Sequence, residues 1–242
     1  MRKPTKISIG MLALVFLVAS AMIAYATPSG PIVTFISNET KQVAAARIIN
    51  TSGGTITTMR LNATTQNPRW KAYVGNVTGS LVLDDANDNT VFDWTLTSVS
   101  GEIYATRSSA SINWTGANCS NSTIISLEDK ALNQTSRDDN ITKTFSTQSH
   151  RGFFVGTREI LQNTCFSVHT YVNSTSQQSL FEEVILYDGT NDTNGNIIYA
   201  TPLEQDAYGF DNITYDFQMI VPEVGLPSWS SSTAYYFYVV LS

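Results

Sequence analysis

The chain has 242 residues, with 14 Lys and Arg against 20 Asp and Glu, and a formal net charge of −6. This acidic balance argues against nucleic acid as a partner, because proteins bind nucleic acid by displacing counterions with basic patches. Charged residues make up only 14% of the sequence, so Ser, Thr and Asn supply most of the surface polarity, as is common in extracellular β proteins.

The first 26 residues carry the parts of a secretory signal peptide. Three basic residues lie within the first six positions, and an uncharged apolar run over residues 7–26 follows and ends in Ala24-Tyr25-Ala26. Cleavage there would give a secreted chain beginning at Thr27. Two alternatives remain open. One is a retained membrane anchor, since about twenty apolar residues can span a bilayer, in which case residues 7–26 alone would contact the membrane. The other is a type IV pilin leader, whose apolar helix stays in a filament core.

Residues 27–37 are expected to form a flexible arm that carries a short apolar strand. Pro28 and Pro31 cannot donate a backbone hydrogen bond, so the start of the arm pairs poorly. A β-prone run behind a flexible arm can leave its own domain and complete the sheet of a neighbour. The candidate donor strand consists of Ile32, Val33, Phe35 and Ile36. The alternative is that this run pairs inside its own domain.

Past the arm, short runs rich in Val, Ile, Thr, Tyr and Phe alternate with Gly, Asn and Asp clusters, which predicts an all-β fold such as a β-sandwich or jelly roll. Predicted strands are Ile32–Ile36, Val43–Ile49, Thr55–Asn62, Arg69–Val74, Ser80–Leu83, Thr90–Leu96, Glu102–Thr106, Ile112–Trp114, Ile141–Phe145, Gly152–Val155, Cys165–Val172, Phe181–Tyr187, Ile197–Ala200, Ile213–Ile220 and Ala234–Leu241. Short helical turns are predicted at Ile124–Leu132 and Thr157–Gln162.

A weak internal repeat suggests how the β region is organised. The sequence Ile-Tyr-Ala-Thr occurs over residues 103–106 and again over residues 198–201, each time after a strand and an Asn/Asp-rich loop. The repeat predicts two β subdomains, over residues 38–131 and 132–242. One continuous β domain is the alternative.

Twelve of the 18 asparagines stand in Asn-X-Ser/Thr sequons. Such sequons are used only outside the cytoplasm and on side chains that reach solvent. Their spread predicts a surface that carries N-linked glycans all round. The candidate sites are Asn38, Asn50, Asn62, Asn76, Asn113, Asn118, Asn121, Asn133, Asn140, Asn173, Asn191 and Asn212.

The only two cysteines, Cys119 and Cys165, predict one disulfide in a secreted chain. Two free buried thiols are the alternative. A metal site built from these cysteines and the two histidines is not expected, because their spacing fits no ligand pattern.

Two loops rich in Asp and Asn offer weak candidates for Ca²⁺, which prefers six to eight oxygen ligands. Their acidic residues are Asp84, Asp85, Asp88, Asp188 and Asp192. Neither loop has EF-hand spacing, and the same residues are ordinary in hairpin turns. We therefore expect no metal and no cofactor other than glycans.

No catalytic constellation is recognisable. A nucleophile needs a base within hydrogen-bond reach, the chain has only two histidines, and no nucleophile elbow, zinc-protease motif or phosphate loop occurs. The sequence therefore predicts that the protein is not an enzyme. Four tryptophans at 70, 94, 114 and 229 could stack on sugars, although tryptophans in β proteins pack more often in the core.

Several stretches resemble a family of secreted β-rich surface and filament proteins from uncultivated small-genome archaea. They cover residues 70–79, 101–105, 181–189, 215–223 and 235–239. The resemblance implies an archaeal envelope protein whose end product is an extracellular filament of glycosylated β subunits. It carries no catalytic signature.

The sequence therefore leads us to expect a structural subunit of an extracellular glycosylated filament or surface lattice, located at the cell surface. Its main partner would be further copies of itself, assembled by strand donation. The alternative is a monomeric surface adhesin or carbohydrate-binding module that contacts other cells or glycans.

Overall fold

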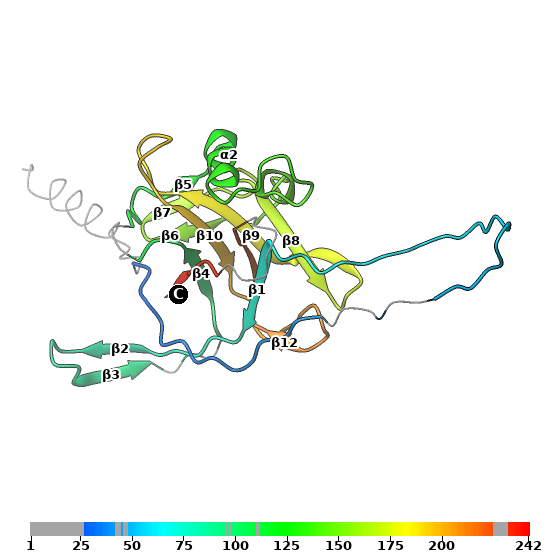
Figure 1. Cartoon of the computed structure of the whole chain (residues 1–242). Coiled ribbons are helices and arrows are strands. Elements are labelled where there is room, and N and C mark those ends of the chain that lie inside the picture. Colours follow the sequence, from blue (N-terminus) through cyan, green and yellow to red (C-terminus); the bar gives the residue numbers. More distant parts are fainter. Residues whose placement is uncertain are drawn as a thin grey trace, which may run out of the picture.

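The computed structural model describes residues 27–41, 45, 48–94, 96, 98–109, 112–224 and 232–242. Most regular elements in these ranges are strands and two are helices, so the fold is mostly β where an all-β fold was predicted (Figure 1). The strands are β1 Trp70–Gly75, β2 Leu81–Asp84, β3 Thr90–Trp94, β4 Gly101–Thr106, β5 Asn118–Cys119, β6 Phe153–Val155, β7 Arg158–Ile160, β8 Ser167–Val172, β9 Ser176–Tyr187, β10 Ile197–Pro202, β11 Ala207–Tyr208, β12 Thr214–Tyr215, β13 Phe217–Pro222 and β14 Tyr236–Leu241. The helices in the same ranges are α2 Ser122–Ala131 and α3 Ile141–Thr144.

A six-stranded antiparallel sheet forms the centre of the molecule (Figure 1). Its order is β14-β4-β10-β9, and β8 and β5 both pair with the far edge of β9. β9 has 12 residues, which is long enough for β8 to pair along its first part and β5 with its last two residues. The long strand β9 therefore joins all the other strands on that side into one sheet.

The two Ile-Tyr-Ala-Thr stretches pair with each other at the centre of this sheet, as parts of β4 and β10. Tyr104 lies opposite Ala200 on one face, and Tyr199 lies opposite Ala105 on the other. Each face thus receives one large and one small side chain at the same height. Both tyrosines are almost fully buried.

Both faces of the central sheet are covered. On one face, β13 contributes Met219 and Val221, and the helices α2 and α3 contribute Ile125 and Ile141 to the same core. β13 pairs with β1 in a separate two-stranded sheet. On the other face, the hairpin β6–β7 packs its apolar residues against β9 and β10. A sheet buried on both sides needs apolar residues at successive positions, and β10 is buried at five consecutive positions after Ile197.

The two helices begin at well-capped positions. The Asn121 side chain accepts a hydrogen bond from the Ile124 N–H at 2.9 Å, and α2 follows, as predicted. The Asn140 side chain accepts from the Lys143 N–H at 2.8 Å, and Asp129 of α2 accepts from the Ile141 N–H at 2.7 Å. The prediction of a strand over Ile141–Phe145 was wrong, because these caps satisfy the first turn of α3.

The helical prediction over Thr157–Gln162 was also wrong. Val155 pairs with Arg158, so only two residues connect β6 to β7. Gly156, the first of them, has φ +58°, a left-handed conformation that tight hairpin turns require. The segment therefore returns as β7 and places Ile160 in the core.

Most of the remaining strand predictions coincide with observed strands. Predicted ranges that overlap observed strands are Arg69–Val74, Ser80–Leu83, Thr90–Leu96, Glu102–Thr106, Gly152–Val155, Cys165–Val172, Phe181–Tyr187, Ile197–Ala200, Ile213–Ile220 and Ala234–Leu241. No strand forms at Ile32–Ile36, Thr55–Asn62 or Ile112–Trp114. Most of Val43–Ile49 lies outside the described residues. The first two segments lack a strand because they find no partner strand on the body, and their side chains are exposed.

Strands from both predicted subdomains share one sheet. β4 comes from residues 38–131, whereas its two neighbours β10 and β14 come from residues 132–242. The signal peptide or apolar helix predicted for residues 1–26 lies outside the described residues. Among the helices that the structure describes, none is long and apolar enough to cross a bilayer.

A disulfide joins Cys119 to Cys165, which confirms the pairing predicted from the sequence. Cys119 ends β5, and Cys165 is fully buried just before β8. The bond therefore links two strands that share one edge of β9 without pairing with each other.

Replacing both cysteines with alanine should lower the free energy of unfolding by about 4 kcal/mol. The reason is that the disulfide, between cysteines 46 positions apart, no longer restricts the unfolded chain. Alanine is chosen because serine at position 165 would create a new sequon at Asn163. Equilibrium urea unfolding without reductant measures the change. An unaltered unfolding midpoint would contradict the expected effect.

Candidate functional site

Two kinds of surface feature are candidates for function. The first is a polar pocket next to β9. The second is a set of apolar segments that project from the body into solvent.

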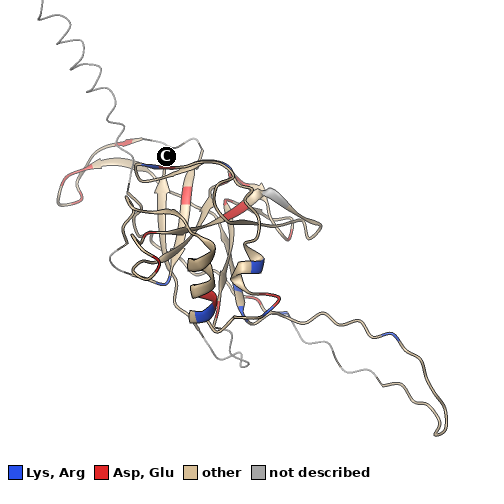
Figure 2. Cartoon of the chain, turned by 90° about the horizontal axis from the view of Figure 1, so that it is seen from above, with Lys and Arg blue, Asp and Glu red and all other residues tan. Residues whose placement is uncertain are grey.

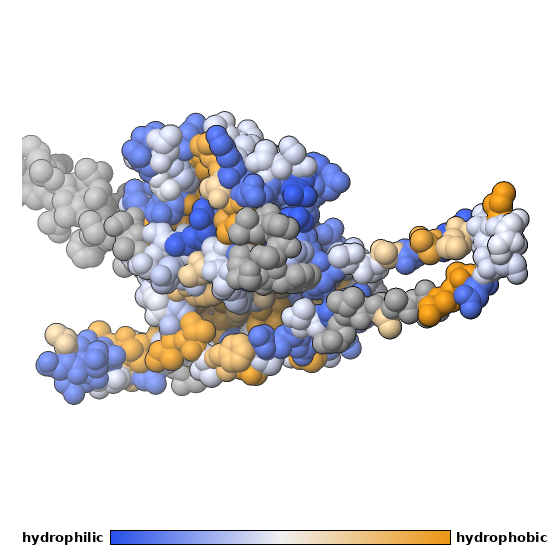
Figure 3. Space-filling model, in the orientation of Figure 1, coloured by the Kyte–Doolittle hydropathy of each residue, from blue (hydrophilic) through white to orange (hydrophobic). Residues whose placement is uncertain are grey.

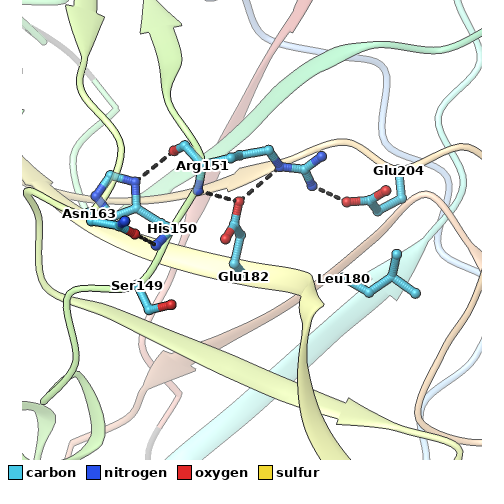
Figure 4. Close-up of a pocket in the computed structure, with 7 residues that line it drawn as sticks. All are labelled: Ser149, His150, Arg151, Asn163, Leu180, Glu182 and Glu204. Atoms are coloured by element: carbon cyan, nitrogen blue, oxygen red, sulfur yellow. Dashed lines mark hydrogen bonds and ion pairs between the residues drawn. The ribbon is translucent and has the colours of Figure 1, made fainter.

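The pocket has a volume of about 550 Å³ and lies where β9, the segment before β6 and the loop after β10 meet (Figure 4). It is lined by Ser149, His150, Arg151, Asn163, Leu180, Glu182 and Glu204. These residues come from four separate stretches of the chain, and no spacing in the sequence signals their proximity. Sequence reasoning therefore missed the pocket entirely.

Arg151 connects the two carboxylates of the pocket. Its backbone N–H and its Nε each donate to Glu182 Oε1 at 2.9 Å, and its Nη2 forms an ion pair with Glu204 (Figure 4). Glu182 is buried, and a buried carboxylate needs such a partner to offset its desolvation. Burial raises the pKa of Glu204, although the charge of Arg151 acts in the opposite direction.

His150 is buried and held on both ring nitrogens. Nε2 accepts from the backbone N–H groups of Thr164 at 3.1 Å and Cys165 at 2.9 Å. Because Nε2 is an acceptor, the ring is neutral with its proton on Nδ1, which donates to the Arg151 carbonyl at 2.7 Å. The ring therefore fixes the backbone beside the disulfide.

A third carboxyl, that of Glu102, lies within the field of Arg151. Burial is the main cause that raises its pKa from 4.5 to about 7, while the Phe154 backbone and Arg151 lower it. Arg151 thus contacts the carboxylates of Glu182 and Glu204 and also acts on the carboxyl group of Glu102 through its charge. Since Arg151 and His150 are already engaged by protein groups, the arrangement binds the pocket walls together and presents no side chain in the geometry of a nucleophile and its base.

The candidate calcium ligands behave as turn residues where their contacts are described. Asp85 accepts from the N–H groups of Asn87 at 2.8 Å and Asn89 at 2.9 Å, inside the turn between β2 and β3. Asp188 accepts from the N–H groups of Asn113 and Asn196. In the part of the chain that the structure describes, no three His, Cys, Asp or Glu side chains are grouped as metal ligands. Asp84, Asp88 and Asp192 therefore belong to no such group among the described residues.

The arm that contains the candidate donor strand is exposed. Ile32 is 99% exposed, Phe35 75% and Ile36 89%, and Val33 is exposed as well. The arm is tied to the body by two hydrogen bonds between Ser29 and Val239 of β14, at 3.1 and 2.8 Å. Beyond this bridge, the run has no strand partner among the described residues.

Two other apolar segments project from the body at opposite ends, and Figures 1 and 2 agree on this placement. The hairpin β2–β3 forms one projection. Residues 48–69, a long excursion without strands before β1, form the other. Figure 3 shows hydrophobic residues on both. Large exposed apolar side chains of the excursion are Ile48, Ile49, Ile56, Met59 and Leu61. Exposed apolar surface of this extent is rare on soluble monomers and usually marks an interaction site.

The sequons lie mostly where glycans can be carried. Eleven of the twelve candidate asparagines are exposed, and Asn140 is buried as the N-cap of α3. A glycan on Asn140 would disrupt that cap. The hairpin β2–β3 lies in a sequon-free stretch over residues 77–112, and the arm from 27 to 37 also has none.

The three tryptophans that the structure describes lie in separate environments. Trp70 packs against Phe145, with ring centroids 6.3 Å apart, and Trp114 packs against Tyr104 at 5.2 Å. Trp94 is exposed on the hairpin, and Trp229 lies outside the described residues. Sequence reasoning predicted both strands of the hairpin but missed that one of its faces carries large, exposed apolar side chains.

Replacing His150 with phenylalanine should destabilise the fold by about 2–4 kcal/mol, because the buried Cys165 N–H and the partly buried Thr164 N–H lose their acceptor. The loss is about 1–3 kcal/mol for a buried group and less for a partly exposed one. The matched control is His169→Phe. That ring makes one hydrogen bond, to the Ser149 carbonyl, and it is only partly buried. Urea unfolding of the two variants compares them, and equal losses would contradict the role assigned to His150.

Glu102 should make the fold more stable in mild acid. Its folded-state pKa of about 7 lies above the ordinary 4.5, so between these pH values the folded state binds more protons than the unfolded state. Stability therefore falls as pH rises through this window, by up to about 3 kcal/mol. Glu102→Gln should reduce the measured fall, whereas Glu159→Gln on the exposed part of β7 should leave it unchanged. Part of the fall remains in both variants, because burial also raises the pKa of Glu183 and of Glu204. Urea unfolding at pH about 5 and about 8 measures both variants.

Comparison with known proteins assigns no family to the chain. No protein-family model, no curated protein and no solved structure matches it. The function of the exposed segments is therefore argued from their own geometry.

Proposed function

We propose that the protein is a structural subunit of an extracellular, glycosylated filament or surface lattice. The subunit is a β-sandwich protein, and it assembles when the apolar run Ile32–Ile36 of one copy adds as a strand to another copy. The single observation that carries the proposal is the exposure of this run, on an arm that pairs with the described strands at Ser29.

Exposure of the arm provides a driving force for assembly. Its four large apolar side chains lie in solvent, and burying each of them would contribute roughly 1.5–3 kcal/mol. A β-prone segment also gains backbone hydrogen bonds when it adds to an open sheet edge, and pockets for alternate side chains give specificity. Both contributions are absent while the arm remains in water.

Pro31 supports donation over self-pairing. Ser29 lies opposite Val239 and exchanges both of its hydrogen bonds with it. Continuing this antiparallel ladder would bring Pro31 opposite Phe237 at the next hydrogen-bonded pair. Proline has no N–H to donate, so the arm cannot extend the ladder along β14 of its own body.

Open strand edges are available to receive a donated strand. β14 is an edge strand of the central sheet, and Ser29 alone among the described residues pairs with its outer side. The hairpin β2–β3 is a separate two-stranded sheet. Unpaired edges of this kind are ready templates for another chain.

The sequons and the disulfide support an extracellular location. Disulfides persist in oxidising compartments, and eleven exposed sequons lie outside the arm and the hairpin. Glycans on these asparagines would keep the outer surface hydrated and leave the apolar segments free for contact. The proposal requires no cofactor, and its principal partner is a second copy of the chain.

Replacing Ile32, Phe35 and Ile36 together with serine should abolish polymer formation, since the donated strand loses its apolar anchors. The matched control replaces Ile56, Met59 and Leu61 with serine, because these residues are also exposed but lie in the excursion. Negative-stain electron microscopy and sedimentation of the secreted protein measure assembly. Unchanged fibres from the arm variant would sink the proposal, and an unaltered protein that stays monomeric at micromolar concentration would favour an adhesin.

A further inference from the structure

The hairpin β2–β3 has one strongly apolar face. Leu81 lies opposite Trp94, and Leu83 lies opposite Phe92, so the four side chains share one side of the two-stranded sheet. The rings of Phe92 and Trp94 are in contact, with centroids 4.9 Å apart. The opposite side carries the pair of Val82 and Asp93, and Val91, at the irregularity in the pairing, is exposed as well. The hairpin therefore gathers four large apolar side chains on one side.

Nothing among the described residues covers this face. Leu81 is 40% exposed, Leu83 53%, Phe92 55% and Trp94 49%. An isolated two-stranded hairpin is marginally stable in water, and a third strand or a packing partner is usually needed. The hairpin therefore lacks the element that would complete it.

The hairpin nevertheless has an ordered turn at its tip and a fixed attachment to the body at its base. Its turn is held by the Asp85 side chain, whose pKa is lowered chiefly by a hydrogen bond from the Asn89 side chain. Its base lies against the end of β14, where Ser100 Oγ donates to the Ser242 carbonyl and Gly79 approaches Leu241. A side chain at Gly79 would collide with Leu241. The hairpin thus leaves the body at a fixed place.

We propose that Ile32–Ile36 of a second copy adds as a third strand to the hairpin β2–β3 and extends the apolar face made by Leu81, Leu83, Phe92 and Trp94. This inference rests on the proposed function and identifies where the donated strand binds. The arm matches the face in chemistry, because it carries four large apolar side chains. Its five-residue run also has the same length as β3.

Within one copy the arm does not cover the hairpin. Ile32 is 99% exposed and Phe92 is 55% exposed, although Ser29 is held at β14, which ends beside the base of the hairpin. The hairpin is therefore open to the arm of a second copy.

The glycan pattern agrees with this surface. The hairpin lies within the longest sequon-free stretch that follows the arm, over residues 77–112. The excursion, although equally exposed, includes Asn50 and Asn62, and glycans there would obstruct close packing. The hairpin and residues 32–36 of the arm therefore contain no sequon, and the Asn38 sequon follows Ile36 by two residues.

The first test removes the face without touching the core. Leu83→Ser with Phe92→Ser should prevent polymer formation and leave the urea unfolding midpoint of the body unchanged, because both residues lie outside the two core clusters. The matched control is Leu127→Ser with Leu161→Ser, which changes two exposed leucines elsewhere and should leave polymers intact. Fibres from the Leu83/Phe92 variant at the normal yield would overturn the docking surface.

The second test identifies the occupant. Mixing a Phe35→Cys variant with a Phe92→Cys variant under mild oxidation should give a disulfide-linked heterodimer, since a disulfide forms only when the two Cα atoms come within about 7 Å. Phe35→Cys mixed with Leu161→Cys is the control and should give none. A chain carrying both Phe35→Cys and Phe92→Cys should form chains of linked copies. A closed, monomeric product would place the arm on its own hairpin and overturn the inference.

The outcomes separate this inference from the proposed function. Polymers that tolerate the serine variant and give no cross-link would leave strand donation standing with a different acceptor. Absence of polymers from the unaltered secreted protein would overturn both. Loss of polymers in the Leu83/Phe92 variant together with the specific cross-link supports both.

Discussion

The pairing of β4 with β10 is the contact on which the rest of the fold depends. These two strands lie at the centre of the main sheet, and each is buried on both faces. Every other layer is positioned by them: β14 and β9 pair with their outer edges, β13 and the helices cover one face, and β6–β7 covers the other. Because the tyrosine of each strand lies opposite the alanine of its partner, neither face has to accommodate two large rings at one position.

This centre explains why the sequence predicted some regions well and others poorly. Runs such as Ile197–Ala200 are apolar at successive positions and follow clear turn residues, so they were recognised as strands. The segment Ile141–Phe145 has strand-like composition, yet two side chains, from Asn140 and Asp129, cap it as a helix. Capping by a residue 12 positions away cannot be read from local periodicity.

The candidate site was predictable in part for a similar reason. The arm is contiguous, so its prolines and apolar residues could be identified together before the structure was known. The acceptor face and the Arg151 pocket are assembled from separated residues. Arg151 and Glu182 are 31 positions apart, and register between β2 and β3 decides which side chains share a face. The strand predictions for those two segments were correct, but the emptiness of one side of the hairpin is a tertiary property.

The proposed contact joins two different surfaces, the arm of one copy and the hairpin of the next, and this has a consequence for the assembly. A contact between unlike surfaces does not close on itself unless the rotation between copies happens to form a ring. The resulting polymer is polar, with an unoccupied hairpin at one terminus and an unused arm at the other. The two ends would then grow at different rates, and a molecule that mimics only one of the two segments would block a single end.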